Sequence, residues 1–165
     1  PLGPFLGKSF ATTVSAWVMP LAALEPARTE GPDQEPTPFE YLRTAEPWGF
    51  DIELTTQLNG SEIARVNAAD NLYWSVAQQL AHMTVNGATV RPGDLMGTGT
   101  ISGPDPSQRG SMLELTWNGT DPIDLGGGAN RTFLEDGDTV SMTATFLGPG
   151  GPTPLGPVTG RISPA

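Results

Sequence analysis

The placement of glycine and proline constrains the fold of this chain more than any other feature. The 165 residues contain 21 glycines and 17 prolines, which fall mostly between short apolar runs and do not form one tract. Both residue types interrupt regular structure and favour turns. No internal repeat is apparent. The pattern therefore favours a loop-rich β domain over a disordered chain.

The clearest local prediction is a β-hairpin centred on Asn59-Gly60, a dipeptide that favours tight hairpin turns. Residues 50–58 alternate apolar and polar side chains, and 63–66 continue the pattern beyond the turn. Other runs rich in β-branched or apolar residues predict further strands. They cover residues 10–18, 95–102, 111–117, 131–134, 140–146 and 158–162.

One long helix is expected among these strands. Apolar residues recur at helical spacing at Leu72, Val76, Leu80 and Met83. Asp70 or Asn71 offers an N-cap, and residues 86–87, an Asn-Gly pair, offer a stop. Residues 21–24 predict one short turn, and residues 25–38 predict an exposed proline-rich loop. The expected fold class is mainly β with one long helix (α+β).

Charge and size limit the classes of partner. A chain of 165 residues is about the size of one domain or a large piece of one. Eighteen acidic and eight basic residues give a formal net charge of −10. Such a charge repels phosphate backbones and anionic membrane surfaces, so we expect no nucleic-acid or membrane partner.

The absence of cysteine excludes disulfides, thiolate nucleophiles and cysteine-based metal sites. No apolar run approaches the roughly 20 residues that span a bilayer, and the first residues lack a basic-then-apolar signal pattern. We therefore expect a cytoplasmic protein. The chain begins with Pro1 and not with methionine, and Pro1 opens a Gly/Pro-rich run, so we also expect the chain to be a fragment.

Lys8 is the only lysine, and it precedes Thr12 and Thr13 in the same run. An ammonium and threonine hydroxyls together suit an anionic oxygen or a metal site. The alternative is that Lys8 lies on a rim and that the threonines simply favour a strand. Thr100 lies in a run of small and hydroxyl residues, 97–104, that either lets a backbone approach a ligand or forms an ordinary bulge.

Two single residues, Glu114 and His82, and the acidic run 136–138 are further candidates. Strand alternation over 111–117 would place Glu114 on the face opposite its apolar neighbours, either facing solvent or orienting a histidine base from another strand. His82, the only histidine, is offset from the apolar stripe of the predicted helix, and we expect a surface or supporting role for it. Residues 136–138, Asp-Gly-Asp, lack the other ligands of a calcium loop and predict a turn.

The runs together resemble the fumarylacetoacetase family, specifically the C-terminal portion of its catalytic domain. The resemblance covers nearly all of residues 1–165 and weakens in the proline-rich loop and in 148–157. It is carried by several runs in order: residues 1–10 (PLGPFLGKSF), 12–18 (TTVSAWV), 86–87 (NG), 91–95 (RPGDL), 99–104 (GTISGP), 110–115 (GSMLEL) and 136–138 (DGD).

The resemblance implies a β-roll-like homodimeric hydrolase that uses Mg²⁺ or Ca²⁺ to cleave a carbon–carbon bond of a diketo acid, giving fumarate and acetoacetate in tyrosine and phenylalanine breakdown. By position, Lys8 resembles the family lysine near the metal and the oxyanion, and Thr12 a threonine of the metal site. Thr100 resembles a substrate contact, and Glu114 the glutamate that orients the catalytic histidine.

The family's catalytic histidine and acidic metal ligands have no counterpart here, because they precede the segment that resembles Pro1 onward. We therefore predict no appreciable hydrolysis by these 165 residues alone. Two alternatives are a hydrolase of the same superfamily acting on another diketo or oxo acid, and a non-catalytic β-rich binding module.

Overall fold

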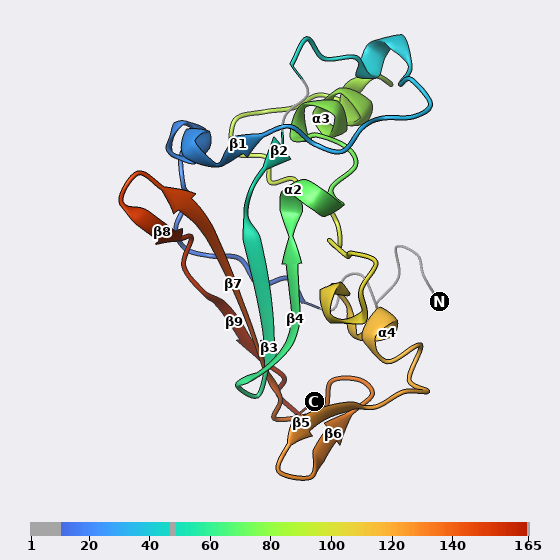
Figure 1. Cartoon of the computed structure of the whole chain (residues 1–165), viewed down its shortest axis with the longest axis vertical. Coiled ribbons are helices and arrows are strands. Elements are labelled where there is room, and N and C mark those ends of the chain that lie inside the picture. Colours follow the sequence, from blue (N-terminus) through green and yellow to red (C-terminus); the bar gives the residue numbers. More distant parts are fainter. Residues whose placement is uncertain (1–10, 47–48, 165) are drawn as a thin grey trace.

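A computed structural model describes residues 11–46 and 49–164. An antiparallel sheet occupies the middle of the molecule, with α3 beyond one end and the β5–β6 hairpin beyond the other (Figure 1). The strand order is β4-β3-β7-β8, and β9 also pairs with β7. The strands of this sheet are β3 (Glu53–Leu58), β4 (Ser61–Asn67), β7 (Thr139–Gly148), β8 (Gly151–Pro154) and β9 (Val158–Arg161).

The predicted hairpin is confirmed. Strands β3 and β4 pair antiparallel around Asn59 and Gly60, which both adopt positive φ, as tight hairpin turns require. The predicted strands at 140–146 and 158–162 correspond to β7 and β9. The long strand β7 pairs with β3 along one edge, while its other edge pairs first with β9 and then with β8. The mainly β class is therefore correct.

Four strand predictions are wrong over the described residues. Residues 11–18 join no ladder. Residues 95–102 contain no strand either, and Gly99 within this run has a φ of +79°, outside the extended region. Residues 111–117 instead contain helix α4 (Met112–Leu115). The run 131–134 contributes only Arg131, the last residue of β6 (Ala129–Arg131), which pairs with β5 (Ile123–Gly126).

The one long helix that the sequence pattern predicted is divided into two shorter helices, and the second begins later than expected. Asn67 caps a short helix α2 (Ala68–Asn71), and Ser75 caps α3 (Val76–Thr84). Ser75 and Gln78 form a reciprocal capping box, which sets the start of α3 and explains why Asp70 and Asn71 are not its N-cap. The helix ends at Thr84, just before the predicted stop. No helix among the described residues is both long and apolar enough to cross a bilayer.

Short elements connect the sheet to the helices. Residues 21–27 form a 3₁₀ helix, η1 (Leu21–Ala27), so the short turn predicted at 21–24 is confirmed in a longer form. It leads into β1 (Arg28–Thr29), which pairs with β2 (Gly49–Phe50). Residues 30–39 have no regular structure and lead to η2 (Glu40–Leu42). A further 3₁₀ turn, η3 (Pro106–Gln108), packs near β4.

The described core is small for a chain of this mass. Leu58, Val66 and Phe146 of the main sheet are buried, whereas Trp17, Val18 and Leu147 are largely exposed. The accessible surface is 11448 Å², compared with about 7,800 Å² expected for a compact monomer of 17.3 kDa. Many large apolar side chains therefore face outward in the isolated chain.

Candidate functional site

The candidate site forms where two loop segments meet. Residues 100–103 lie against residues 108–111, and the Gly103 N–H donates to the Gln108 carbonyl at 2.9 Å. A Cβ at Gly110 would collide with the carbonyl oxygen of Ile101 and lie 2.8 Å from Thr100 Cγ2. Gly110 therefore allows a close approach between two backbone segments, whereas the approach of a ligand to the 97–104 run stays a prediction.

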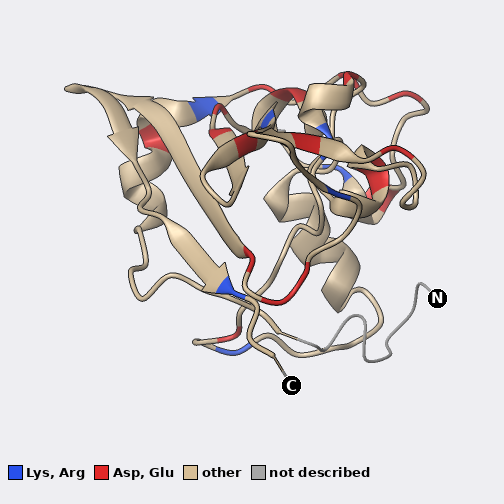
Figure 2. Cartoon of the chain, turned by 90° about the horizontal axis from the view of Figure 1, so that it is seen from below, with Lys and Arg blue, Asp and Glu red and all other residues tan. Residues whose placement is uncertain are grey.

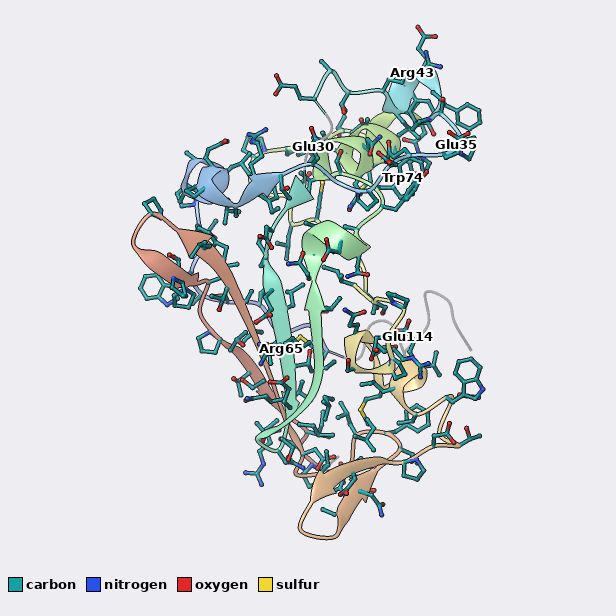
Figure 3. The ribbon with its side chains drawn as sticks, viewed as in Figure 1. Glu30, Glu35, Arg43, Arg65, Trp74 and Glu114 are labelled. Carbon is teal, nitrogen blue, oxygen red and sulfur yellow. The ribbon has the colours of Figure 1, made fainter. Side chains whose placement is uncertain are left out.

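Glu114 lies at the centre of this junction, on α4 beside β4 (Figure 3). Its half-buried carboxylate accepts two hydrogen bonds at the same oxygen. Ser102 Oγ donates to Oε2 at 2.9 Å, and Ser111 Oγ donates to Oε2 at 2.7 Å. Among the residues that the structure describes, no donor bonds to Oε1. Glu114 thus combines one anchored oxygen with one oxygen available to a further partner.

Helix α4 exists because of a local capping pattern. The Ser111 hydroxyl accepts from the Glu114 N–H at 3.3 Å, as an N-cap does. The helix ends at Leu115, and Trp117 and Asn118, which both have positive φ, lie in the turn that follows it. The prediction of a strand here was wrong because Ser-x-x-Glu over 111–114 is a helix-start signal, which the apparent alternation concealed.

Arg109 gives the junction a positive neighbour without pairing with the Glu114 carboxylate. Its Nη1 donates to the Glu114 carbonyl at 3.1 Å, and its guanidinium lies 5.7 Å from the Trp117 ring centroid. A cation over an aromatic face is attracted by the ring quadrupole. Arg109 also borders a cavity of about 210 Å³ between α4 and the main sheet. The guanidinium therefore braces α4 and the turn that follows it.

The structure brings together two of the four predicted site residues. Thr100 is exposed and lies two residues from Ser102, so it shares the junction with Glu114. Thr12 is also exposed, but the structure gives its side chain no hydrogen bond within the described ranges, and its neighbour Thr13 lies against Gly160 of β9. Lys8 lies outside the described residues.

The described residues do not form a metal site by themselves. No group of three or more His, Asp or Glu side chains is close enough to hold an ion within residues 11–46 and 49–164. Mg²⁺ and Ca²⁺ require about six or more oxygen ligands, most often including carboxylates. The Thr12 hydroxyl alone does not meet that requirement.

Two other sequence candidates have structural roles. His82 Nδ1 lies 3.1 Å from the Tyr41 hydroxyl, and the two rings stack with centroids 6.2 Å apart on the surface of α3. Residues 136–138 form the predicted turn, in which Asp138 is buried and paired with Arg131 at 2.9 Å. The hydrogen bonds from Arg131 lower the pKa of Asp138 from 3.8 to about 2, with smaller contributions from Asn59 and the Glu135 N–H.

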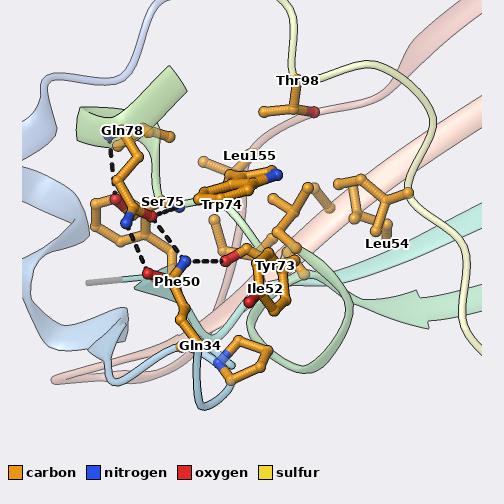
Figure 4. Close-up of a pocket in the computed structure, with 18 residues that line it drawn as sticks. Gln34, Phe50, Ile52, Leu54, Tyr73, Trp74, Ser75, Gln78, Thr98 and Leu155 are labelled. Atoms are coloured by element: carbon orange, nitrogen blue, oxygen red, sulfur yellow. Dashed lines mark hydrogen bonds between the residues drawn. The ribbon is translucent and has the colours of Figure 1, made fainter. Parts of the chain in front are cut away.

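An apolar cavity of about 220 Å³ lies between the main sheet and the start of α3 (Figure 4). Two of its polar side chains bond to each other, since Gln34 and Gln78 exchange amide hydrogen bonds of 3.0 and 2.7 Å. The apolar side chains of Trp74, Phe50 and Leu54 line the wall of the cavity. A cavity without a free charge does not suit a dicarboxylate ligand, so the junction at Glu114 remains the candidate site.

Sequence reasoning missed Ser102, Ser111 and Arg109 as neighbours of Glu114. The capping pattern at 111–114 could have identified Ser111. Ser102 gave no comparable signal, because its contact depends on the fold of residues 103–110. Arg109 gave no signal either, because a sequence does not indicate its contacts with the Glu114 carbonyl and the Trp117 ring.

The fold and the junction define a mainly β domain that presents an anchored carboxylate at the meeting of two glycine-containing loops. A family comparison matches residues 1–162 to the family described as "Fumarylacetoacetate (FAA) hydrolase C-terminal". The chain belongs to this family.

Individual relatives agree along the whole chain. It is 50% identical to the fumarylacetoacetase of Arabidopsis thaliana and 51% identical to that of Homo sapiens, each over 170 residues. The fumarylacetoacetase of Caenorhabditis elegans is 44% identical. Each alignment covers 100% of this chain but only 40 to 41% of the relative. The chain therefore spans about two fifths of the length of these curated relatives.

Proposed function

We propose that the protein carrying this chain hydrolyses fumarylacetoacetate to fumarate and acetoacetate, and that these residues supply part of its active site. One observation carries the proposal: Glu114 presents a carboxylate with one anchored and one available oxygen, in a chain about half identical to fumarylacetoacetases. A carboxylate held in this way can orient a histidine and stabilise the imidazolium that forms when the histidine takes a proton.

In the proposed reaction, water adds to a carbonyl carbon of the substrate and the carbon–carbon bond to the leaving group breaks. The bonding electron pair stays with the leaving carbon as an enolate, which then accepts a proton. Glu114 orients the histidine that removes the proton from water. Thr100 contacts the substrate from the adjacent loop, and Lys8 stabilises the developing oxyanion.

The general base is proposed to come from a part of the protein outside these residues. His82 does not suit the role, because it lies on α3 and stacks on Tyr41 of η2, whereas Glu114 lies on α4. It also has no carboxylate partner among the described residues. The available Oε1 of Glu114 is the acceptor for the incoming imidazole.

A divalent cation, Mg²⁺ or Ca²⁺, is proposed as the cofactor, with Thr12 and the Lys8 backbone oxygen as ligands from this chain. When bound, such an ion polarises the carbonyl and the developing oxyanion. The described residues lack the carboxylates that the ion needs, so the remaining ligands must come from other parts of the protein.

The proposed partners follow from the charge of the chain and from its exposed apolar surface. Acidic side chains are spread over several segments and outnumber the basic ones (Figure 2), which disfavours nucleic acid and anionic membranes. The large exposed apolar area supports burial against further protein, including the second subunit of a homodimer. A cytoplasmic location stays the prediction that was made from the sequence.

The test is an assay of the full-length protein with fumarylacetoacetate, following substrate loss and fumarate formation. We expect hydrolysis by the wild type and a loss of at least about a hundredfold in kcat for Glu114→Gln, because the base loses its orienting carboxylate. Glu30→Gln is the matched control, since Glu30 is exposed and far from Glu114 (Figure 3).

Two results would contradict the proposal. An inactive wild type would refute fumarylacetoacetate as the substrate, and activity on another diketo acid would favour the superfamily alternative. Full activity of Glu114→Gln would refute the catalytic role of this site and favour the binding-module alternative. The reading frame upstream of the Pro1 codon gives an independent check, because the proposal requires it to encode a histidine and clustered carboxylates.

A further inference from the structure

We propose that Ser102 and Ser111 are positioning residues that fix the Glu114 carboxylate so that only Oε1 can receive the catalytic base. The inference rests on the proposed function, because it concerns how Glu114 acts. The two serines come from different segments, one from the loop before η3 and one from the cap of α4. Together they hold the carboxylate from two sides of the junction.

The direction of each hydrogen bond follows from the donors already present. The Gly110 N–H donates to Ser102 Oγ at 3.0 Å, and the Glu114 N–H donates to Ser111 Oγ at 3.3 Å. Backbone N–H groups can only donate, so each hydroxyl acts as an acceptor in these contacts. Each serine therefore has its single hydrogen left to donate, and in both cases the acceptor within reach is Glu114 Oε2.

The two hydrogen bonds give the two carboxylate oxygens of Glu114 different roles. An ionised carboxylate oxygen has about two lone-pair sites. Both sites of Oε2 are used by the serine hydroxyls, at 2.9 and 2.7 Å. Oε1 keeps its own sites available, so an imidazole N–H that approaches Glu114 must bond there. The serines thus select the oxygen and restrict rotation of the carboxylate plane.

The neighbouring backbone makes this arrangement stiff. Ser102 can reach both Gly110 and Glu114 only because the 100–103 segment passes directly over Gly110. Ser102, Ser111 and Glu114 are all half-buried, which limits competition from water. A purely structural role for the serines would close the loop and cap α4, but it would not require both hydroxyls to end on one carboxylate oxygen.

The experiment compares serine variants of the full-length protein with fumarylacetoacetate as substrate. Ser102→Ala removes one donor. Ser111→Gly removes the other but tolerates the helix start, because glycine is an acceptable N-cap. Ser107→Ala is the control, because its hydroxyl lies in the neighbouring η3 turn and bonds Asp105 at 2.7 Å, not Glu114. The readouts are kcat, KM and Tm for each variant.

We expect kcat to fall about tenfold for Ser102→Ala and for Ser111→Gly, and about a hundredfold for the double variant, because small misplacements of a catalytic group are costly. KM should stay within about twofold, since neither serine contacts substrate in this scheme. Ser102→Thr and Ser111→Thr keep the hydroxyl and should recover most of the loss. Ser107→Ala should keep wild-type kcat.

A second measurement separates positioning from structure. If the serines act through Glu114, adding Ser102→Ala to Glu114→Gln should lower kcat no further, because the group that it positions is already lost. Additive losses in this cycle, or loss of kcat in Ser102→Ala equal to that in Ser107→Ala, would overturn the inference while leaving an active wild type and the proposed function intact. A wild type without hydrolytic activity would overturn both.

Discussion

Asp138 is expected to stabilise the protein through its charge, and the effect can be measured by replacing it with asparagine. Its side chain is 3% exposed and contacts three groups that converge from separate segments. Asn59 Nδ2 donates to Oδ1 at 2.8 Å, Arg131 Nε donates to Oδ2 at 2.9 Å, and the Glu135 N–H donates to Oδ2 at 2.8 Å. The carboxylate thereby joins the β3–β4 turn to the start of β7.

The magnitude follows from the pKa of Asp138. Hydrogen bonds from Arg131, followed by those from Asn59 and Glu135, lower this pKa from 3.8 to about 2 although burial opposes the shift. At 1.36 kcal/mol per pKa unit, the charged form contributes about 2 kcal/mol to the free energy of unfolding. Asp138→Asn keeps the size of the side chain but removes the charge, so it should lose about that amount at pH 7.

The pH dependence distinguishes charge from packing. Because the folded pKa is lower than the unfolded one, the stabilisation is fully present above about pH 5 and is lost as the pH falls through about 4 towards 2. Urea unfolding of the full-length wild type and Asp138→Asn across this range should show a stability difference that shrinks with acid. Asp136→Asn, an exposed position in the same turn, is the control and should change stability by less than about 0.5 kcal/mol. A difference of constant size from pH 7 to pH 2 would refute the electrostatic reasoning.

Three further predictions concern the site and the cofactor. Gly110→Ala should lower both kcat and Tm of the full-length protein, because a Cβ there collides with the Ile101 carbonyl; unchanged values of both would show that the loops do not need this close approach. Chelation of divalent cations should abolish hydrolysis, and added Mg²⁺ or Ca²⁺ should restore it, whereas activity after complete metal removal would count against the proposed cofactor. The purified 165-residue chain should not hydrolyse fumarylacetoacetate, since its described part holds no cluster of metal-binding carboxylates; measurable turnover would contradict this.

The accuracy of the sequence predictions depended on how local each signal was. The hairpin at Asn59-Gly60 was predicted correctly because turn chemistry and alternation lie within a few residues of each other. The strand predicted at 111–117 was wrong because its apolar spacing was ambiguous, and a single hydroxyl at Ser111 favoured a helix start instead. The strand predicted at 95–102 was also wrong: the run holds no strand, and a positive φ at Gly99 interrupts any extended backbone within it.

The candidate site, like the fold, could be predicted only in part from the sequence. Thr100 and Glu114 were singled out from the sequence, and the structure places them at one junction. The serines that hold Glu114 were not predicted as its partners, since hydrogen bonds between segments depend on how the loops fold back. Lys8 lies outside the described residues, and the role of Thr12 stays a prediction.

The sequence by itself determined the mainly β class, the acidic surface, the central hairpin and the resemblance that the family match confirmed, because composition, short-range turn chemistry and ordered motifs can be read along the chain. Tertiary structure alone decided that Ser102, twelve residues before Glu114, shares its oxygen Oε2 with Ser111. It also decided that Asn59 and Asp138, 79 residues apart, form a partly buried hydrogen bond. Contacts of this kind depend on the direction and burial of side chains from separate segments, which are set only when the whole chain packs.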